Sequence, residues 1–110
     1  MAIPEITLRR IKRWCDSLAP KEIWDQVKYE YDVINNYIVT IVEVRPSWNG
    51  EGEHTRFPIA RLRYNQRRNE WSLYWRDRNL KFHEYDIAPT QLVDDMLDYI
   101  KNSGDPIFFG

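Results

Sequence analysis

The chain has 110 residues, of which 43% are hydrophobic and 15% aromatic, and its net charge is −1. This length fits one domain over residues 1–110, and the bulky apolar content predicts a packed core rather than disorder. The single cysteine excludes an intramolecular disulfide framework, and no apolar run approaches the roughly 20 residues that span a bilayer. The N-terminus also lacks the apolar segment of a signal peptide. We therefore expect a soluble, cytoplasmic protein that does not associate with membranes.

The small net charge conceals a segregation of charge along the chain. Residues 1–21 sum to +3, residues 22–55 to −5, residues 56–81 to +6 and residues 82–110 to −5. Such blocks either cancel between neighbouring strands of the fold or build separate positive and negative faces. A separate basic face would steer anions toward the protein.

Residues 4–19 are predicted to form the first helix, because Pro4 suits a first helical turn and Pro20 follows its end. Four residues share one apolar stripe of this helix: Leu8, Ile11, Cys15 and Leu18. Cys15 lies on the stripe, so we interpret it as a core thiol rather than a nucleophile. The basic cluster at residues 9–13 lies mostly off the stripe; a solvent-exposed face is favoured over a phosphate-contacting one.

The strands are expected within residues 26–86. Alternation and β-branched residues mark segments at 27–34, 37–45, 56–64, 70–76 and 80–85. Asn35 and Asn36 supply a turn that tolerates left-handed backbone angles, and Pro58 predicts an edge or a bulge near the start of the third segment. Short connections between consecutive strands favour an antiparallel meander.

Residues 90–102 are predicted to form the second helix, with Thr90 as its N-cap. The buried stripe combines Leu92 or Val93 with Met96, Leu97 and Ile100. The apolar tail at 105–110 is expected to pack on the sheet or on a second subunit. The fold class is therefore α+β: a curved antiparallel β-meander of about five strands, with an N-terminal helix and a C-terminal helix packed on the sheet.

Several segments together carry a family resemblance: TIVEVRPSW, TRFPIARLRY, WSLYWRDRNLKFHEYD and the terminal DPIFFG. In this order they resemble a small bacterial family of uncharacterised proteins, domain of unknown function 3024. The resemblance covers roughly residues 22 to 110 and so leaves out the basic N-terminal helix. It implies no catalytic residues, cofactor or ligand.

Most enzyme classes lack their signature in this sequence. There is no glycine-rich phosphate loop, no His or Cys pair at metal-ligand spacing and no nucleophile elbow, so neither a cofactor nor a metal site is predicted. One pair of carboxylates keeps an enzymatic alternative open. Asp32 and Glu43 on adjacent strands, followed by Arg45, could form the Mg²⁺ site of a nuclease or phosphodiesterase. An ion pair of Glu43 with an arginine on a neighbouring strand is the favoured interpretation.

The last three strands carry basic and aromatic residues in alternation. If Trp71, Leu73 and Trp75 face the helices, the opposite face carries Arg61, Arg63, Tyr74, Arg76, Lys81, His83 and Tyr85. Such a face could stack bases and neutralise phosphates. Alternatively, the arginine stems cover the tyrosine rings, and their charged ends pair with Glu30, Asp32 and Glu43.

Trp48, in a glycine-bearing loop after Arg45, is a further candidate contact. We therefore predict a non-enzymatic binding or adaptor module that uses these two residues together with the arginine and aromatic face. A protein partner or self-association is favoured, and single-stranded nucleic acid is the other candidate partner. The nuclease and a homo-oligomeric structural protein remain as alternatives.

Overall fold

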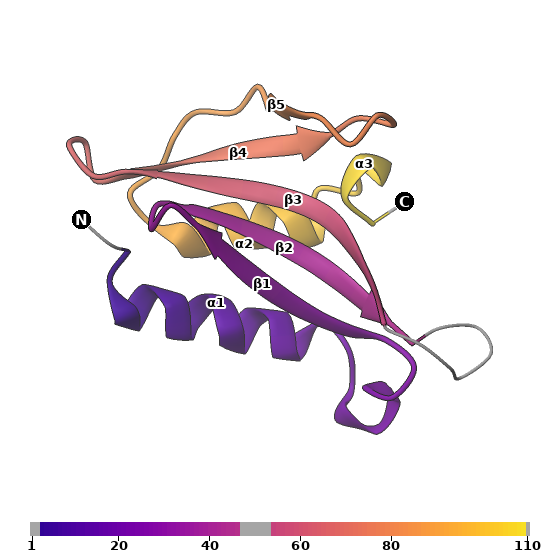
Figure 1. The fold of residues 1–110 in the computed structure, drawn as a ribbon. Coiled ribbons are helices and arrows are strands. Elements are labelled where there is room, and N and C mark those ends of the chain that lie inside the picture. The colour runs from indigo at the N-terminus through magenta and orange to yellow at the C-terminus, as the bar shows by residue number, and fades with distance from the viewer. Residues whose placement is uncertain (1–2, 47–53, 110) are drawn as a thin grey trace.

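The computed structural model describes residues 3–46 and 54–109 and contains one sheet with helices on one side of it (Figure 1). All five strands are antiparallel and lie in sequence order, which confirms the predicted meander. The elements are α1 (Glu5–Ser17), the short 3-10 helix η1 (Lys21–Ile23), β1 (Lys28–Ile34), β2 (Ile38–Arg45), β3 (Thr55–Asn65), β4 (Glu70–Arg76), β5 (Phe82–Glu84), α2 (Val93–Asn102) and α3 (Pro106–Phe109). Within the described residues no helix is long and apolar enough to cross a membrane.

Helix α1 lies within the predicted range 4–19, with Pro4 as its N-cap rather than in its first turn, and it buries part of the apolar stripe that the sequence marks. Ile11 and Cys15 are fully buried in the core, while Leu8 packs at its margin. The interpretation of Cys15 as a core thiol is therefore confirmed.

Helix α2 starts at Val93, three residues after the predicted N-cap. The backbone N–H and C=O of Thr90 both bond to Trp71 of β4, at 3.1 and 2.7 Å, so this residue belongs to the sheet edge. Its hydroxyl still accepts a hydrogen bond from the Leu92 N–H and donates one to Asp95. Thr90 thus positions the entry to the helix without being its N-cap.

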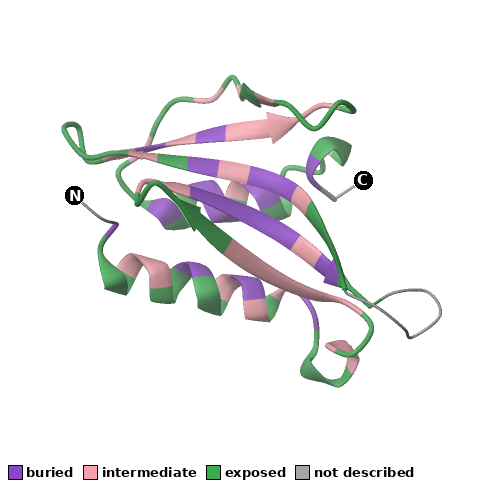
Figure 2. Cartoon of the chain, in the orientation of Figure 1, coloured by how far each residue is buried: buried purple, intermediate pink, exposed green. Residues whose placement is uncertain are grey.

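One core lies between the helices and the sheet, visible as the buried stripes of α1, α2 and the central strands (Figure 2). The strands contribute alternate residues to it, as a pleated strand with one packed face must. The helices contribute the stripes at 3.6-residue spacing. The strand residues of this core are Val39, Ile41, Ile59, Ala60, Leu62, Trp71 and Leu73, and α2 adds Val93, Met96, Leu97 and Ile100.

A β-bulge interrupts the pairing of β2 with β3, between Ile41 and Val42. Opposite it, Ile59 is the extra residue, next to Pro58. The irregularity predicted from Pro58 is therefore confirmed. An extra residue reverses the alternation of side chains along the strand. Each residue of β3 before the bulge therefore points to the face opposite to the one that uninterrupted alternation predicts.

The C-terminal tail packs against the same body. Phe108 in α3 is buried and its ring lies 5.4 Å from that of Tyr85. The tail was predicted to pack either on the sheet or on a second subunit. The contact with its own sheet is formed.

Candidate binding surface

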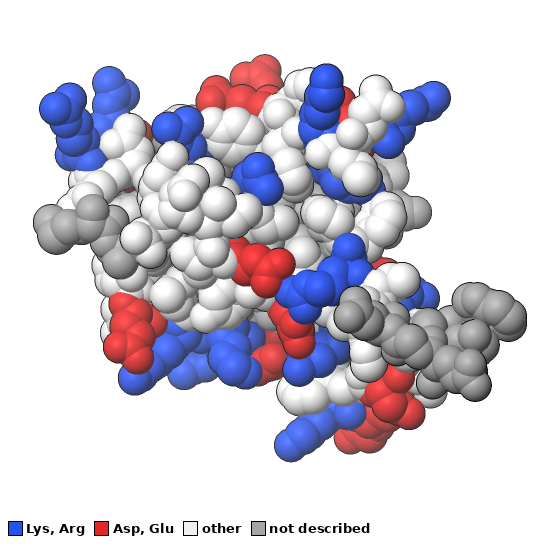
Figure 3. All heavy atoms as spheres, in the orientation of Figure 1, with Lys and Arg blue, Asp and Glu red and all other residues white. Residues whose placement is uncertain are grey.

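The sheet face turned away from the helices is here called the outer face, and no helix of the described residues lies over it (Figure 1). Leu62 and Leu73 point into the core, so their neighbours along β3 and β4 point outward. The outer face of these two strands carries Arg61, Arg63, Tyr74 and Arg76. Figure 3 looks onto this face, with basic groups over β3 and the neighbouring turns and mixed charges toward β1. Four of the predicted binding residues thus lie together where expected.

The three outer-face arginines each lie over an aromatic ring. Stacking of this kind attracts the guanidinium to the ring face and shields the apolar carbon atoms of both groups. The pairs are Arg61 over Phe82 at 4.0 Å, Arg76 over Phe57 at 4.2 Å and Arg63 over Tyr37 at 5.5 Å. The sequence predicted that arginine stems cover tyrosine rings; the structure instead places the guanidinium groups over Phe82, Phe57 and Tyr37.

Arg61 holds a central position on the outer face. Its Nε donates to Thr40 Oγ1 at 3.1 Å, and Thr40 is only 4% exposed. Burial lowers the pKa of the Arg61 guanidinium, since desolvation disfavours the charged form. No carboxylate among the described residues pairs with Arg61, Arg63 or Arg76. The expected pairing of these arginines with Glu30, Asp32 and Glu43 is therefore wrong.

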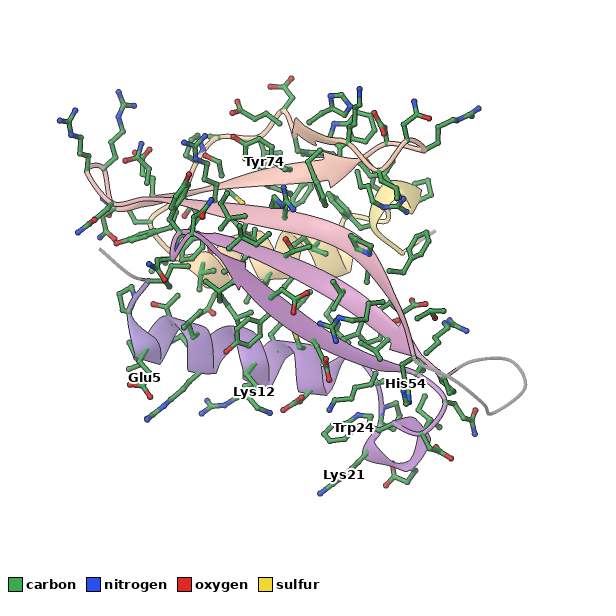
Figure 4. All side chains as sticks on the ribbon, in the orientation of Figure 1. Glu5, Lys12, Lys21, Trp24, His54 and Tyr74 are labelled. Atoms are coloured by element: carbon green, nitrogen blue, oxygen red, sulfur yellow. The ribbon has the colours of Figure 1, made fainter. Side chains whose placement is uncertain are left out.

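Arg76 has a structural function at the end of β4. Its Nε donates to the carbonyl oxygen of Pro58 at 2.9 Å, so it bonds to β3 next to the bulge, where β4 ends. One side of its guanidinium is consequently committed to the fold. Tyr74, beside it on β4, is half-buried, and its hydroxyl lies 3.5 Å from Glu84 (Figure 4).

The acidic residues of β1 are neutralised by an arginine that the sequence analysis did not single out. Arg56 contacts Glu30 and Asp32, each at 2.7 Å, and Lys28 adds a contact with Glu30. The Arg56 and Lys28 contacts lower the pKa of Glu30. Uninterrupted alternation along β3 would place Arg56 on the helix-side face with Leu62, whereas the bulge turns it to the outer face. Alternation alone therefore could not predict that Arg56 contacts the acidic residues of β1.

The nuclease site does not assemble, because Asp32 and Glu43 lie on opposite faces of the sheet. Asp32 pairs with Thr40, three residues before Glu43, and an odd separation along a strand reverses the face. Glu43 instead accepts hydrogen bonds from Arg45 and from the hydroxyl of Tyr29. Within the described residues there is also no group of three acidic, His or Cys side chains that could hold a metal ion.

The assignment of β5 to the outer face is wrong by one residue. His83 pairs with Trp75 and therefore shares the helix-side face, where the two rings lie 4.8 Å apart. Phe82 and Glu84 occupy the outer face in its place. The turn before β5 sets this register, because Leu80 adopts a left-handed φ of 66° there.

The other β5 candidates have local partners or lie in that turn. His83 Nε2 lies 2.6 Å from Asp77 Oδ2. Lys81 precedes the strand, and its backbone N–H donates to the other Asp77 oxygen. The Tyr85 hydroxyl donates to Asp105 at 2.8 Å and lies 3.0 Å from that of Tyr99, on the helix side. Lys81, His83 and Tyr85 are therefore removed from the outer-face set.

Of the two remaining candidates, only Arg45, the last residue of β2, is described by the structure. Arg45 is exposed and pairs with Glu43, so its charge is partly neutralised. Trp48 falls outside the described residues. On the opposite side of the outer face, Tyr37, Arg63 and Arg67 line a groove of about 350 Å³ that the sequence analysis missed. Tyr37 and Arg67 lie in or beside turns, where strand alternation gives no signal.

The family described as "Domain of unknown function (DUF3024)" matches residues 2–110, so the chain belongs to this family. The match includes α1, which the resemblance from sequence segments had left out. A "Glutamine-dependent NAD(+) synthetase" of Oryza sativa subsp. indica is 37% identical over 60 residues, or 50% of this chain. The aligned part is 8% of that protein, so this chain spans only a small fraction of the synthetase's length. No solved structure matches this chain.

Proposed function

We propose that this member of the DUF3024 family is a small, non-enzymatic binding or adaptor module whose outer face docks a protein partner. The observation that carries the proposal is the group of outer-face arginines, Arg61, Arg63 and Arg76. They lie on a sheet face without a covering helix, and none has a carboxylate partner among the described residues.

The electrostatics of Arg61 support a binding role. A partly buried guanidinium loses hydration, and within this chain it regains only a hydroxyl contact from Thr40. An anionic group from a partner would offset this loss with charge-assisted hydrogen bonds, which are about twice as strong as neutral ones. The fold therefore holds a cation in a position that a partner would stabilise.

A protein partner is favoured over single-stranded nucleic acid for two reasons. Nucleic-acid-binding domains are usually strongly basic, whereas this chain has a net charge of −1 and a pI near 6.1. Base stacking also needs exposed ring faces, and the half-buried rings of Phe82 and Tyr37 each have one face covered by an arginine. The proposed setting is the bacterial cytoplasm, which suits the reduced, buried thiol of Cys15.

Chemical-shift mapping of the backbone amides tests this proposal. Three probes are added separately to the labelled full chain: a polyglutamate peptide, an oligothymidine and an excess of the unlabelled protein itself. We expect the peptide to shift amides of β3 and β4 around residues 60–64 and 72–76. Shifts confined to the basic residues of α1, or to no part of the sheet, would overturn the proposed docking face.

The matched control is Arg9→Gln, which removes one positive charge from the far side of the molecule. Arg9 is exposed on α1 and forms an ion pair with Glu5, one helical turn away. Figure 4 shows this helix, marked by Glu5 and Lys12, well separated from Tyr74 on β4. The variant should leave the shifts on β3 and β4 unchanged.

A further inference from the structure

The stretch of β3 that carries Arg61 and Arg63 is regular. From Ala60 to Asn65 it pairs without interruption with β4, and the bulge lies before this stretch. Two residues along a strand span about 6.6–6.8 Å, and both side chains then point to the same face. The spacing of the two guanidinium groups along β3 therefore equals the two-residue repeat of an extended chain.

We propose, on the basis of the proposed function, that the partner contributes an extended acidic segment that lies along β3. Carboxylates at alternate positions of this segment engage Arg61 and Arg63. An extended peptide has the same two-residue repeat as β3, so successive carboxylates on one side of it match the two arginines. The recognised pattern is an acidic residue, any residue, then a second acidic residue.

The hydrogen bond that Arg61 already makes determines how this side chain can bind a carboxylate of the partner. Its Nε is occupied by Thr40, while its two terminal nitrogens donate to no acceptor among the described residues. These nitrogens form the end of the planar fork that binds both oxygens of a carboxylate. Phe82 lies under the guanidinium plane at 4.0 Å and limits its reorientation. The side chain is thus held ready for an end-on carboxylate contact.

Apolar residues beside the arginines favour a peptide over a nucleic acid. Across the sheet from Arg63, the same outward row continues through Ile38 of β2 to Ile34 of β1. Ile34 is 39% exposed, and Ile38 is half-buried. An apolar side chain next to the acidic pair would pack on these isoleucines. A phosphate backbone would leave them uncovered.

Fluorescence anisotropy with two labelled peptides of equal charge tests the spacing. One peptide alternates Glu and Ser, and the other has the same residues in blocks of two Glu and two Ser. We expect the alternating peptide to bind several-fold more tightly to the full chain. Arg61→Gln should weaken its binding about tenfold, since a charge-assisted bond contributes roughly 1.4 kcal/mol or more.

Conservative and control variants make the result specific. Arg61→Lys keeps the charge but loses the planar fork, so it should recover only part of the affinity. Arg63→Gln, at a more exposed position, gives a second measurement that does not disturb Thr40 or Phe82. Arg9→Gln should bind like the unchanged protein, and a urea unfolding curve for each variant verifies that it is folded.

Equal affinity for the two peptides would overturn the alternating-carboxylate inference, as would an equal loss in Arg9→Gln and Arg61→Gln. Tighter binding of oligothymidine than of the alternating peptide, with loss in Arg61→Gln, would also overturn it while leaving the outer face as the docking site. Failure of all three mapping probes to shift the amides of β3 and β4 would instead remove the proposed function itself. The two failures are therefore distinguishable.

Discussion

The two faces of the sheet bury their residues by different means. Leu62 and its neighbours on the helix side are covered by α1 and α2, which pack at fixed positions. On the outer face, Thr40, Val42 and Val44 of β2 are also 8% exposed or less, yet none of the helices in the described part of the chain lies over them. Their cross-strand neighbours carry long side chains, including Arg56 and Arg61. Charged side chains with apolar stems therefore provide part of the cover.

This difference separates stability from binding. Packing on the helix side is lost only when the protein unfolds, because the helices must detach. The arginine cover of the outer face can rearrange by rotation of side chains, so a partner can be accommodated while the fold stays intact. We expect substitutions on the helix side to change the free energy of unfolding. We expect substitutions on the outer face to change mainly affinity.

The largest expected effect concerns access to the helix-side core. Burial raises the pKa of the Cys15 thiol from 9.0 to about 12. At mildly alkaline pH the reactive thiolate is then about a thousandfold rarer in the native protein than in the unfolded chain. Labelling with a chromogenic disulfide reagent should accordingly be about a thousandfold slower without urea than in urea. Rapid labelling of the native protein would show that the core is not sealed.

A second prediction compares neighbours on β4 that point to opposite faces. Leu73→Ala should lower the free energy of unfolding by about 2–5 kcal/mol, because Leu73 is 1% exposed and its loss leaves a cavity. Tyr74→Ala removes a larger side chain from the half-buried outer face and should cost less. Urea unfolding monitored by circular dichroism gives both values. Equal losses would contradict the separation of the two faces.

The alternation along β3 and β4 was sufficient to predict which of their central residues lie on each face. It failed in two places, for identifiable reasons. At β5 the register depends on a turn that is closed by the Asp77 side chain and by the left-handed backbone of Leu80. No local sequence pattern shows which face of the sheet each side chain takes after such a turn. At Arg56 the bulge reverses the alternation; Pro58 indicated an irregularity but not its sense.

The candidate surface was predicted less completely than the fold. Hydrogen-bond partners depend on distances between strands that a sequence pattern does not contain. The sequence therefore indicated that the arginines would share a face with rings, but it did not identify Phe82 or Tyr37 as those rings.

A third prediction concerns the tail, whose hydrogen bonds extend the helix-side packing. Tyr85→Phe removes the contacts of one hydroxyl with Asp105 and Tyr99 and should cost about 1–2 kcal/mol. The matched control is Tyr64→Phe, which removes a single hydrogen bond to Asn69 in the exposed β3–β4 turn. Urea unfolding should rank the control as the milder change. The reverse order would argue that the tail adds little to the stability of the body.

The smallest expected effect belongs to the ion pairs of the outer face. Arg56 and Lys28 lower the pKa of Glu30, so the stabilisation is complete above the ordinary Glu value of about 4.3 and is lost as pH falls through the lowered value. The Glu30 side chain is 35% exposed, and solvent screening limits the effect to less than about 1 kcal/mol. Arg56→Gln should therefore flatten the decline in the free energy of unfolding that sets in as pH falls below the ordinary Glu value of about 4.3. Added salt should reduce the difference between the variant and the unchanged protein, because ions screen exposed charges. Arg9→Gln removes an equal charge whose ion pair lies within α1, and it should leave the slope as it is. A steep slope that persists in Arg56→Gln would show that the acid sensitivity arises elsewhere, and the outer face would then contribute less to stability than its ion pairs indicate.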